Sequence, residues 1–138
     1  MIDLKKLAHE LNTQDNRATA YPLFCVEVKR RIYGENMCNP DGSIWVWPKD
    51  AECSFDTKEE AIAHFREYGY ADAEFIDKLE EIEYEEYWEF DTAHLTEKGA
   101  NAYIRINGHN LPERRIYVTS QYRCHEFNDL IDWLKEQE

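Results

Sequence analysis

The sequence contains no long apolar run. Nowhere in its 138 residues does it approach the roughly 20 apolar residues that a membrane-spanning helix needs. The segment Met1–Lys6 also lacks the apolar core of a signal peptide. The four cysteines include no CxxC pair, which favours reduced thiols over a disulfide framework. We therefore expect a cytoplasmic protein with no membrane partner.

Familiar catalytic and cofactor motifs are missing as well. There is no phosphate-binding loop, dinucleotide fingerprint or GxSxG nucleophile motif. Cys38, Cys53 and His64 fit no zinc-binding spacing. Cys25 falls inside a predicted strand, where we expect it to be buried and inert, and Cys124 has a histidine only as its sequence neighbour. We expect a protein that is not an enzyme and that binds no metal or cofactor.

Positive charge is scarce. Lys and Arg number 16 against 29 Asp and Glu, which gives a formal net charge of -13. The densest basic cluster, Lys29-Arg30-Arg31, lies in a predicted strand that would divide its side chains between two faces. Nucleic-acid binding needs clustered cations that release counterions from phosphates. The composition argues against a direct nucleic-acid partner and favours a basic protein partner, and nucleic-acid-binding proteins are one class of such partners.

Apolar content is sufficient for a folded core. Apolar residues make up 43% of the chain and aromatic residues 14%, which fits one globular domain covering residues 1–138. Apolar spacing and period-two alternation predict the elements. In chain order these are a helix at 4–12, strands at 21–33 and 44–47, helices at 57–69 and 75–82, a strand at 84–92, a helix at 96–108, a strand at 116–119 and a helix at 127–134. This mixed order predicts an α+β fold, with a small, mostly antiparallel sheet covered by helices.

Two of the predicted helices echo each other. Thr57–Gly69 aligns without a gap with Thr96–Gly108, and the two segments share Thr, Ala, Arg and Gly positions. Thr at the start and Gly at the end are typical helix caps. The echo therefore indicates either an internal duplication or the common preferences of helix ends.

The segment Asp72–Asp91 is the most acidic part of the chain. Its many carboxylates accompany one cation, Lys78, and alternate with aromatic residues that a disordered acidic tail would lack. We expect a folded acidic surface that imitates a line of phosphates and blocks a basic groove on a host or defence protein. The expected partner-binding residues are Asp77, Glu80, Glu81, Glu83, Glu85, Glu86 and Glu89. The alternative is an acidic surface that only keeps the protein soluble.

Polar loops form a second candidate site. If the loops meet, Asp15, Arg17, His109, Asn110 and Arg123 could bind a small anionic ligand or move protons in a catalytic module. Asn and Asp also cap turns, so purely structural roles are the alternative.

Two segments near the ends of the chain carry a family resemblance. The first is Asn12–Arg17 followed by Pro22, Phe24, Val26, Arg31, Ile32 and Gly34, and the second is Asn107–Leu111 followed by Arg115–Val118, Ser120, Tyr122 and Arg123. In these residues the chain resembles a family of small, acidic phage and prophage proteins of unknown function. The resemblance implies a viral or prophage origin, and it implies no catalytic residue.

Aromatic residues exceed what one face of a short sheet can hide. Trp45, Trp47, Tyr87 and Trp88 are the residues concerned. We expect some of them at a contact surface, with a homodimer as one form of contact. Repulsion between acidic faces would make such a dimer pair through another surface.

Overall fold

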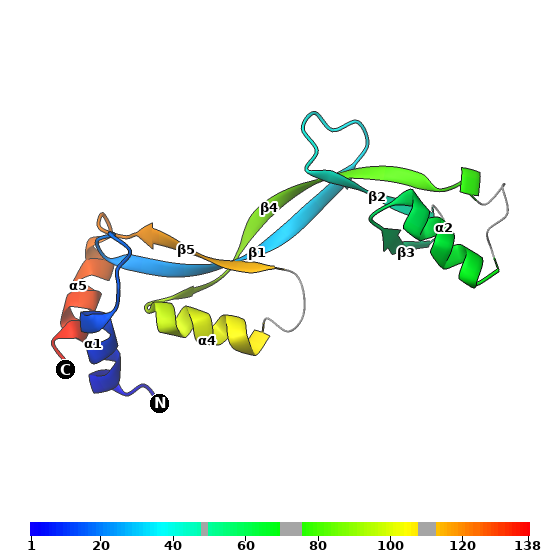
Figure 1. Cartoon of the computed structure of the whole chain (residues 1–138). Coiled ribbons are helices and arrows are strands. Elements are labelled where there is room, and N and C mark those ends of the chain that lie inside the picture. Colours follow the sequence, from blue (N-terminus) through cyan, green and yellow to red (C-terminus); the bar gives the residue numbers. More distant parts are fainter. Residues whose placement is uncertain (48–49, 70–75, 108–112) are drawn as a thin grey trace. The chain divides into compact units, whose positions relative to one another are not determined.

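The protein has an α+β fold, as the sequence predicts. The computed structural model describes residues 1–47, 50–69, 76–107 and 113–138, with the backbone alone for residues 50–53. The elements are α1 (Leu4–Thr13), β1 (Pro22–Gly34), β2 (Gly42–Trp47), β3 (Asp50–Phe55), α2 (Lys58–Glu67), β4 (Glu80–His94), α4 (Glu97–Asn107), β5 (Arg114–Ser120) and α5 (His125–Lys135). The strands form an antiparallel sheet in the order β3-β2-β4-β1-β5 (Figure 1). None of the helices in the described ranges combines the length and the apolar character needed to cross a membrane.

The chain divides into two compact units. Unit 1 contains residues 1–29 and 88–138, and unit 2 contains residues 30–87. The long strands β1 and β4 contribute residues to both units. Each unit has its own helices and its own apolar cluster.

In unit 1, α4 covers one face of the sheet. Phe24 and Val26 of β1 alternate toward this face and have no exposed surface. Ala100 of α4 is equally buried, and its small side chain lets the helix approach the strands closely. Ile116 and Val118 of β5, the register partners of Val26 and Phe24, complete the cluster.

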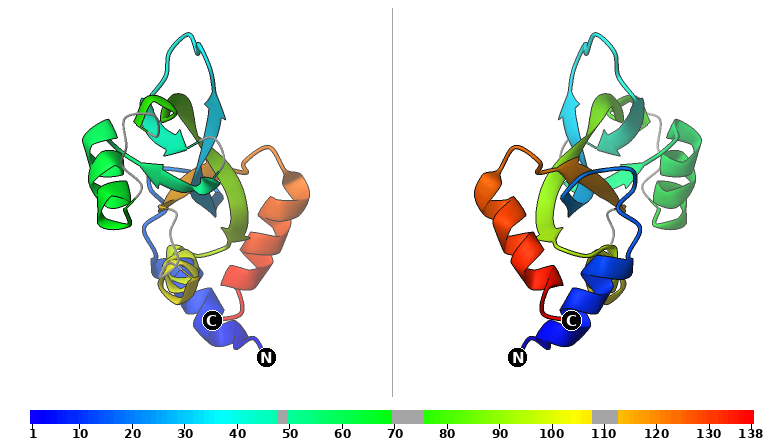
Figure 2. Two further views of the ribbon diagram at one scale, coloured as in Figure 1. Left: turned by 90° about the vertical axis from the view of Figure 1, so that its right-hand side faces the viewer. Right: turned by 90° about the vertical axis from the view of Figure 1, so that its left-hand side faces the viewer.

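A second cluster in unit 1 joins the first and last helices. Figures 1 and 2 show α1 and α5 side by side, and buried Leu11, Ile131 and Leu134 form their contact. His9 and Asn12 of α1 form hydrogen bonds with the Glu138 carboxylate. Both bonds lower the pKa of Glu138, and the bond with His9 has the larger effect. Residues far apart in sequence therefore hold the two helices together.

In unit 2, α2 packs on the β2–β3 hairpin. Ala61 and Phe65 of α2 are buried with Leu79, and Trp45 and Trp47 of β2 pack against this cluster. Both tryptophans were expected to be candidates for a contact surface. They are partly buried and pack against the core cluster of unit 2, because α2 covers this side of the hairpin.

The echoing helices are built alike where the structure describes both. Thr57 and Thr96 each accept a hydrogen bond from the backbone N–H three residues later, at 3.1 Å and 3.0 Å. Ala61 and Ala100, each four residues after its Thr, have no exposed surface. Gly69 has a φ of +81°, the left-handed conformation expected of a glycine cap, whereas Gly108 lies outside the described residues.

Two local predictions were wrong. The helix expected at 75–82 is present at Ile76 and Asp77 but does not continue to Ile82, because strand β4 begins at Glu80 and Ile82 pairs with Ile44 of β2. Leu79 and Ile82 are three residues apart, a spacing that fits a helix. Pairing with β2 outweighs this local pattern and places Ile82 in the sheet. Strand β3 was also missing from the predicted order, and it pairs with β2.

Candidate functional site

Strand β4 divides the predicted acidic residues between two sides. Glu81 is the register partner of Trp45 in β2, and Glu83 is the register partner of Ser43. Both glutamates therefore lie on the side of the sheet where Trp45 packs against α2. Side chains alternate along a strand, so Glu85 lies on the same side, with roughly 6.7 Å between the Cα atoms of successive members along the strand. We call Glu81, Glu83 and Glu85 the acidic row. Of the other predicted residues, Glu80 and Glu86 lie on the opposite side, Asp77 precedes the strand, and Glu89 belongs to unit 1.

Hydrogen bonds hold two members of the acidic row in place. Glu81 accepts one from the Ser43 hydroxyl at 2.7 Å, and Glu83 accepts one from the Met37 backbone N–H at 2.8 Å. Glu81 and Glu83 line a hollow of about 230 Å³ together with Gly34, Glu35 and Asn36. The loop after β1 therefore adds Glu35 to the negative charge, a residue that was not predicted from the sequence.

The acidic row has cations nearby but forms no ion pair with them in the described part of the chain. Among the residues that the structure describes, no Lys or Arg forms an ion pair with Glu81, Glu83 or Glu85. Arg30 lies on the same side of β1, because its neighbour Arg31 faces the other side. The Lys58 ammonium of α2 lies 5.3 Å from the ring centroid of Trp45, the register partner of Glu81. Together with Glu35 at the same hollow, the acidic row sets four carboxylates against these two cations. This side of unit 2 keeps a net negative charge.

The opposite side of unit 2 carries a compensated cluster. The Arg31 guanidinium stacks on the Tyr84 ring at 4.0 Å from its centroid and lies 3.9 Å from the Glu86 carboxylate. Tyr33 meets Tyr84 edge to face at 6.2 Å. Glu86 is thus bound within the protein, and the two sides of β4 differ in the charge that they present.

Negative charge is concentrated in unit 2. Residues 30–87 contain 16 Asp and Glu against six Lys and Arg, so this unit carries ten of the 13 net negative charges. Unit 1 contains 13 acidic and ten basic residues and carries the other three. The acidic row therefore lies in the part of the protein with the strongest negative field.

The second candidate site is only partly described. Asp15 and Arg17 lie together, since the Arg17 backbone N–H donates to the Asp15 carboxylate at 2.8 Å. The Arg17 guanidinium donates to Glu97, which raises the pKa of Arg17 and occupies the group that would bind an anion. Arg123 donates to the hydroxyl of Tyr122 at 2.8 Å. His109 and Asn110 lie outside the described residues.

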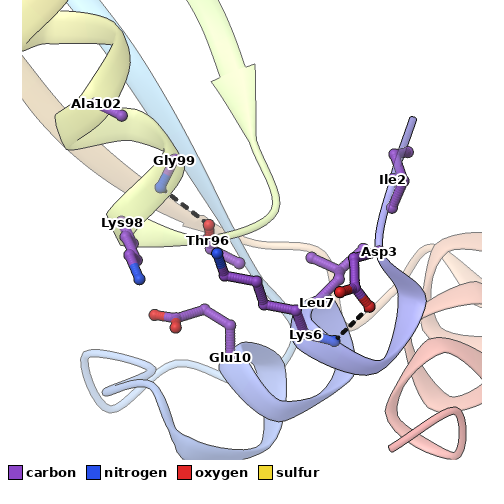
Figure 3. Close-up of a pocket in the computed structure, with 9 residues that line it drawn as sticks. All are labelled: Ile2, Asp3, Lys6, Leu7, Glu10, Thr96, Lys98, Gly99 and Ala102. Carbon is purple, nitrogen blue, oxygen red and sulfur yellow. Dashed lines mark hydrogen bonds between the residues drawn. The ribbon is translucent and has the colours of Figure 1, made fainter.

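Two hollows lie between α1 and α4, and one of them is lined by Asp15. The first, of about 300 Å³, is lined by the apolar groups of Leu7, Gly99 and Ala102 and by the charged side chains of Lys6, Glu10 and Lys98, among others (Figure 3). A neighbouring hollow of about 430 Å³ is lined by Asp15, Glu97 and Arg105 among others. Acids and bases are mixed at both, so neither hollow selects a ligand of one charge.

No metal-binding cluster is formed in the part of the chain that the structure describes. Cys38 is exposed, and the side chain of Cys53 lies outside the described residues. The His64 ring packs against the rings of Phe55 and Tyr68, with centroids 4.9 and 5.0 Å apart. His64 thus has a packing role in unit 2.

Comparison with known proteins finds no matching family model, no similar curated protein and no similar solved structure. The candidate site therefore rests on its own geometry and charge.

Proposed function

We propose that this protein is a non-enzymatic accessory protein of the small acidic phage or prophage type, acting in the cytoplasm by binding a basic protein. The acidic row makes the contact, and the bound surface is a groove that normally holds nucleic acid. The observation that carries the proposal is the row of Glu81, Glu83 and Glu85, evenly spaced and without ion pairs within the described part of the chain.

Preorganisation supports binding by the acidic row. Binding partners lose affinity when mobile side chains must be ordered on contact. Ser43 and the Met37 backbone already hold Glu81 and Glu83. A cationic partner would meet carboxylates whose positions are fixed.

Apolar groups beside the acidic row add contact area. Tyr87, two residues beyond Glu85, is 41% exposed, and Ile32, one residue after Arg31, is 53% exposed on the same side. Tyrosine is enriched at interfaces because it offers a large, rigid ring with a polar end. A partner with cations around an apolar centre fits this surface better than a purely basic tail does.

A matched pair of triple variants tests the proposal. The first changes Glu81, Glu83 and Glu85 to Gln. The control changes Glu59, Glu60 and Glu67 of α2, all exposed and in the same unit, to Gln and so removes the same charge. Each protein is used to capture binding proteins from bacterial host lysate at about 50 mM and about 500 mM salt.

We expect the wild type and the α2 control to retain the same basic protein at low salt, and the acidic-row variant to lose it. Added nucleic acid should displace the partner. Equal losses in both variants would mean that total charge alone governs binding. Capture of abundant ribosomal proteins alone would favour the solubility alternative.

A further inference from the structure

The sheet of unit 1 has a face that points away from α4. Phe24, Val26 and Val28 point toward α4 and are buried, so the alternating residues of β1 point the other way. Their register partners in β5 lie on the same side, and Arg115, opposite Glu27, is one of these partners. Trp88 of β4 lies there too, because the Arg115 guanidinium is 4.3 Å from its ring centroid. We call this surface, with Glu27, Lys29, Trp88, Phe90, Arg115 and Tyr117, the open face.

Large aromatic rings are exposed on the open face. Phe90 is 61% exposed and Tyr117 is 52% exposed. The Arg115 guanidinium stacks on both Trp88 and Tyr117, at 4.3 and 5.6 Å from their centroids. Single exposed apolar residues are common, but rings held in a group by a shared cation are typical of contact surfaces.

The charges of the open face cancel. Arg115 pairs with Glu27 at 2.8 Å, and Lys29 pairs with Glu113 at 3.4 Å. Glu27 and Glu113 would repel the phosphates of a nucleic acid. A basic protein would experience no net electrostatic attraction to this face, because its acids and bases are equal in number. The open face is therefore an electrically balanced, aromatic surface on a chain of net charge -13.

We propose that the open face binds a second copy of this chain. Two copies repel each other through their net charge, and this repulsion is least where the facing surfaces are neutral. In a two-fold contact the same residues meet on both sides, so a face that carries two acids and two bases can place each charge against its opposite. The rings of Phe90 and Tyr117 would then be buried at the centre, where aromatic side chains contribute most. The acidic row lies in unit 2 and does not belong to this surface.

Sedimentation velocity over a protein range from about 1 μM to about 1 mM tests the proposal. The variants are Phe90→Thr and Tyr117→Thr, since Thr keeps a high strand propensity. The control is Tyr33→Thr, because Tyr33 also lies on a strand and is 51% exposed, against 52% for Tyr117. We expect a wild-type dimer whose dissociation constant rises about tenfold in each open-face variant and stays unchanged in the control. A wild type that is monomeric throughout, or a control that weakens the dimer equally, would overturn the proposal.

Two measurements on the wild type guard against variants that fail to fold. Oxidative footprinting should show Phe90 and Tyr117 becoming protected as the protein concentration rises, whereas Tyr68, which is 64% exposed in unit 2, stays reactive. Raising salt from about 50 mM to about 500 mM should tighten the dimer by screening the charge repulsion, although it weakens binding of a basic protein. Salt effects of opposite sign separate this surface from the acidic row. Equal protection at Tyr68, or a dimer that salt dissociates, would refute the open face as the contact.

Discussion

Replacing Ala61 by Leu should destabilise unit 2, whereas the same change two residues later should not. Ala61 has no exposed surface and lies in a cluster with Phe65 and Leu79. The Phe65 ring is already in edge-to-face contact with the ring of Phe55 at 5.6 Å, so little room remains for added carbon atoms. Overpacking of this kind costs about 1–3 kcal/mol in the free energy of unfolding.

Ala63→Leu is the matched control, because Ala63 is exposed on the same helix and Leu forms helices almost as readily as Ala. We expect this variant within about 0.5 kcal/mol of the wild type. Urea denaturation followed by far-ultraviolet circular dichroism measures both, and hydrogen exchange should place the loss from Ala61→Leu in unit 2. Equal effects at Ala61 and Ala63 would contradict the packing of α2 against the hairpin.

Two further predictions concern other parts of the sheet. A methyl group at Gly42 would overlap the Tyr84 hydroxyl, so Gly42→Ala should displace the ring on which Arg31 stacks. We expect a loss of about 1–3 kcal/mol in the free energy of unfolding, measured by urea denaturation. A variant with the wild-type free energy of unfolding would contradict the contact between Gly42 and Tyr84. The Tyr103 hydroxyl donates a hydrogen bond to Asp91, and this bond raises the pKa of Tyr103. The bond therefore stabilises the folded protein below about pH 10, and this stabilisation is lost as the pH rises through the pKa that Tyr103 has in the folded state. Tyr103→Phe should therefore lose less stability than the wild type between about pH 9 and about pH 11, and parallel losses in the two proteins would argue against this bond.

Local patterns in the sequence predicted much of the fold. The apolar spacing of α1 and α5 and the alternation of β1 are strong local signals, and all three elements were confirmed within a few residues. Threonine caps also marked α2 and α4 correctly. The part that failed is the start of β4, where strand pairing with β2 outweighs a helical spacing of apolar residues. Pairing of this kind is a long-range effect that a local window does not contain.

The candidate site was predictable in composition but not in geometry. An acidic surface followed from residue counts alone. Its division into two sides depends on β4 beginning at Glu80, and the selection of Glu81 and Glu83 depends on Ser43 and Met37, which lie 38 and 46 positions away in the chain. Extending the period-two pattern of β4 backward through Ile82 would have found the acidic row.

Specific cation binding by the acidic row is the central element of the proposed function. The most direct measurement is an NMR titration of the isotope-labelled full chain with a short lysine-rich peptide at about 50 mM salt. We predict saturable shifts at the backbone amides of Glu81, Glu83 and Glu85, and near Glu35, with little change at Glu59 and Glu60 of α2. Shifts of equal size at all of these acidic residues would show that the peptide follows overall charge, and would contradict the claim.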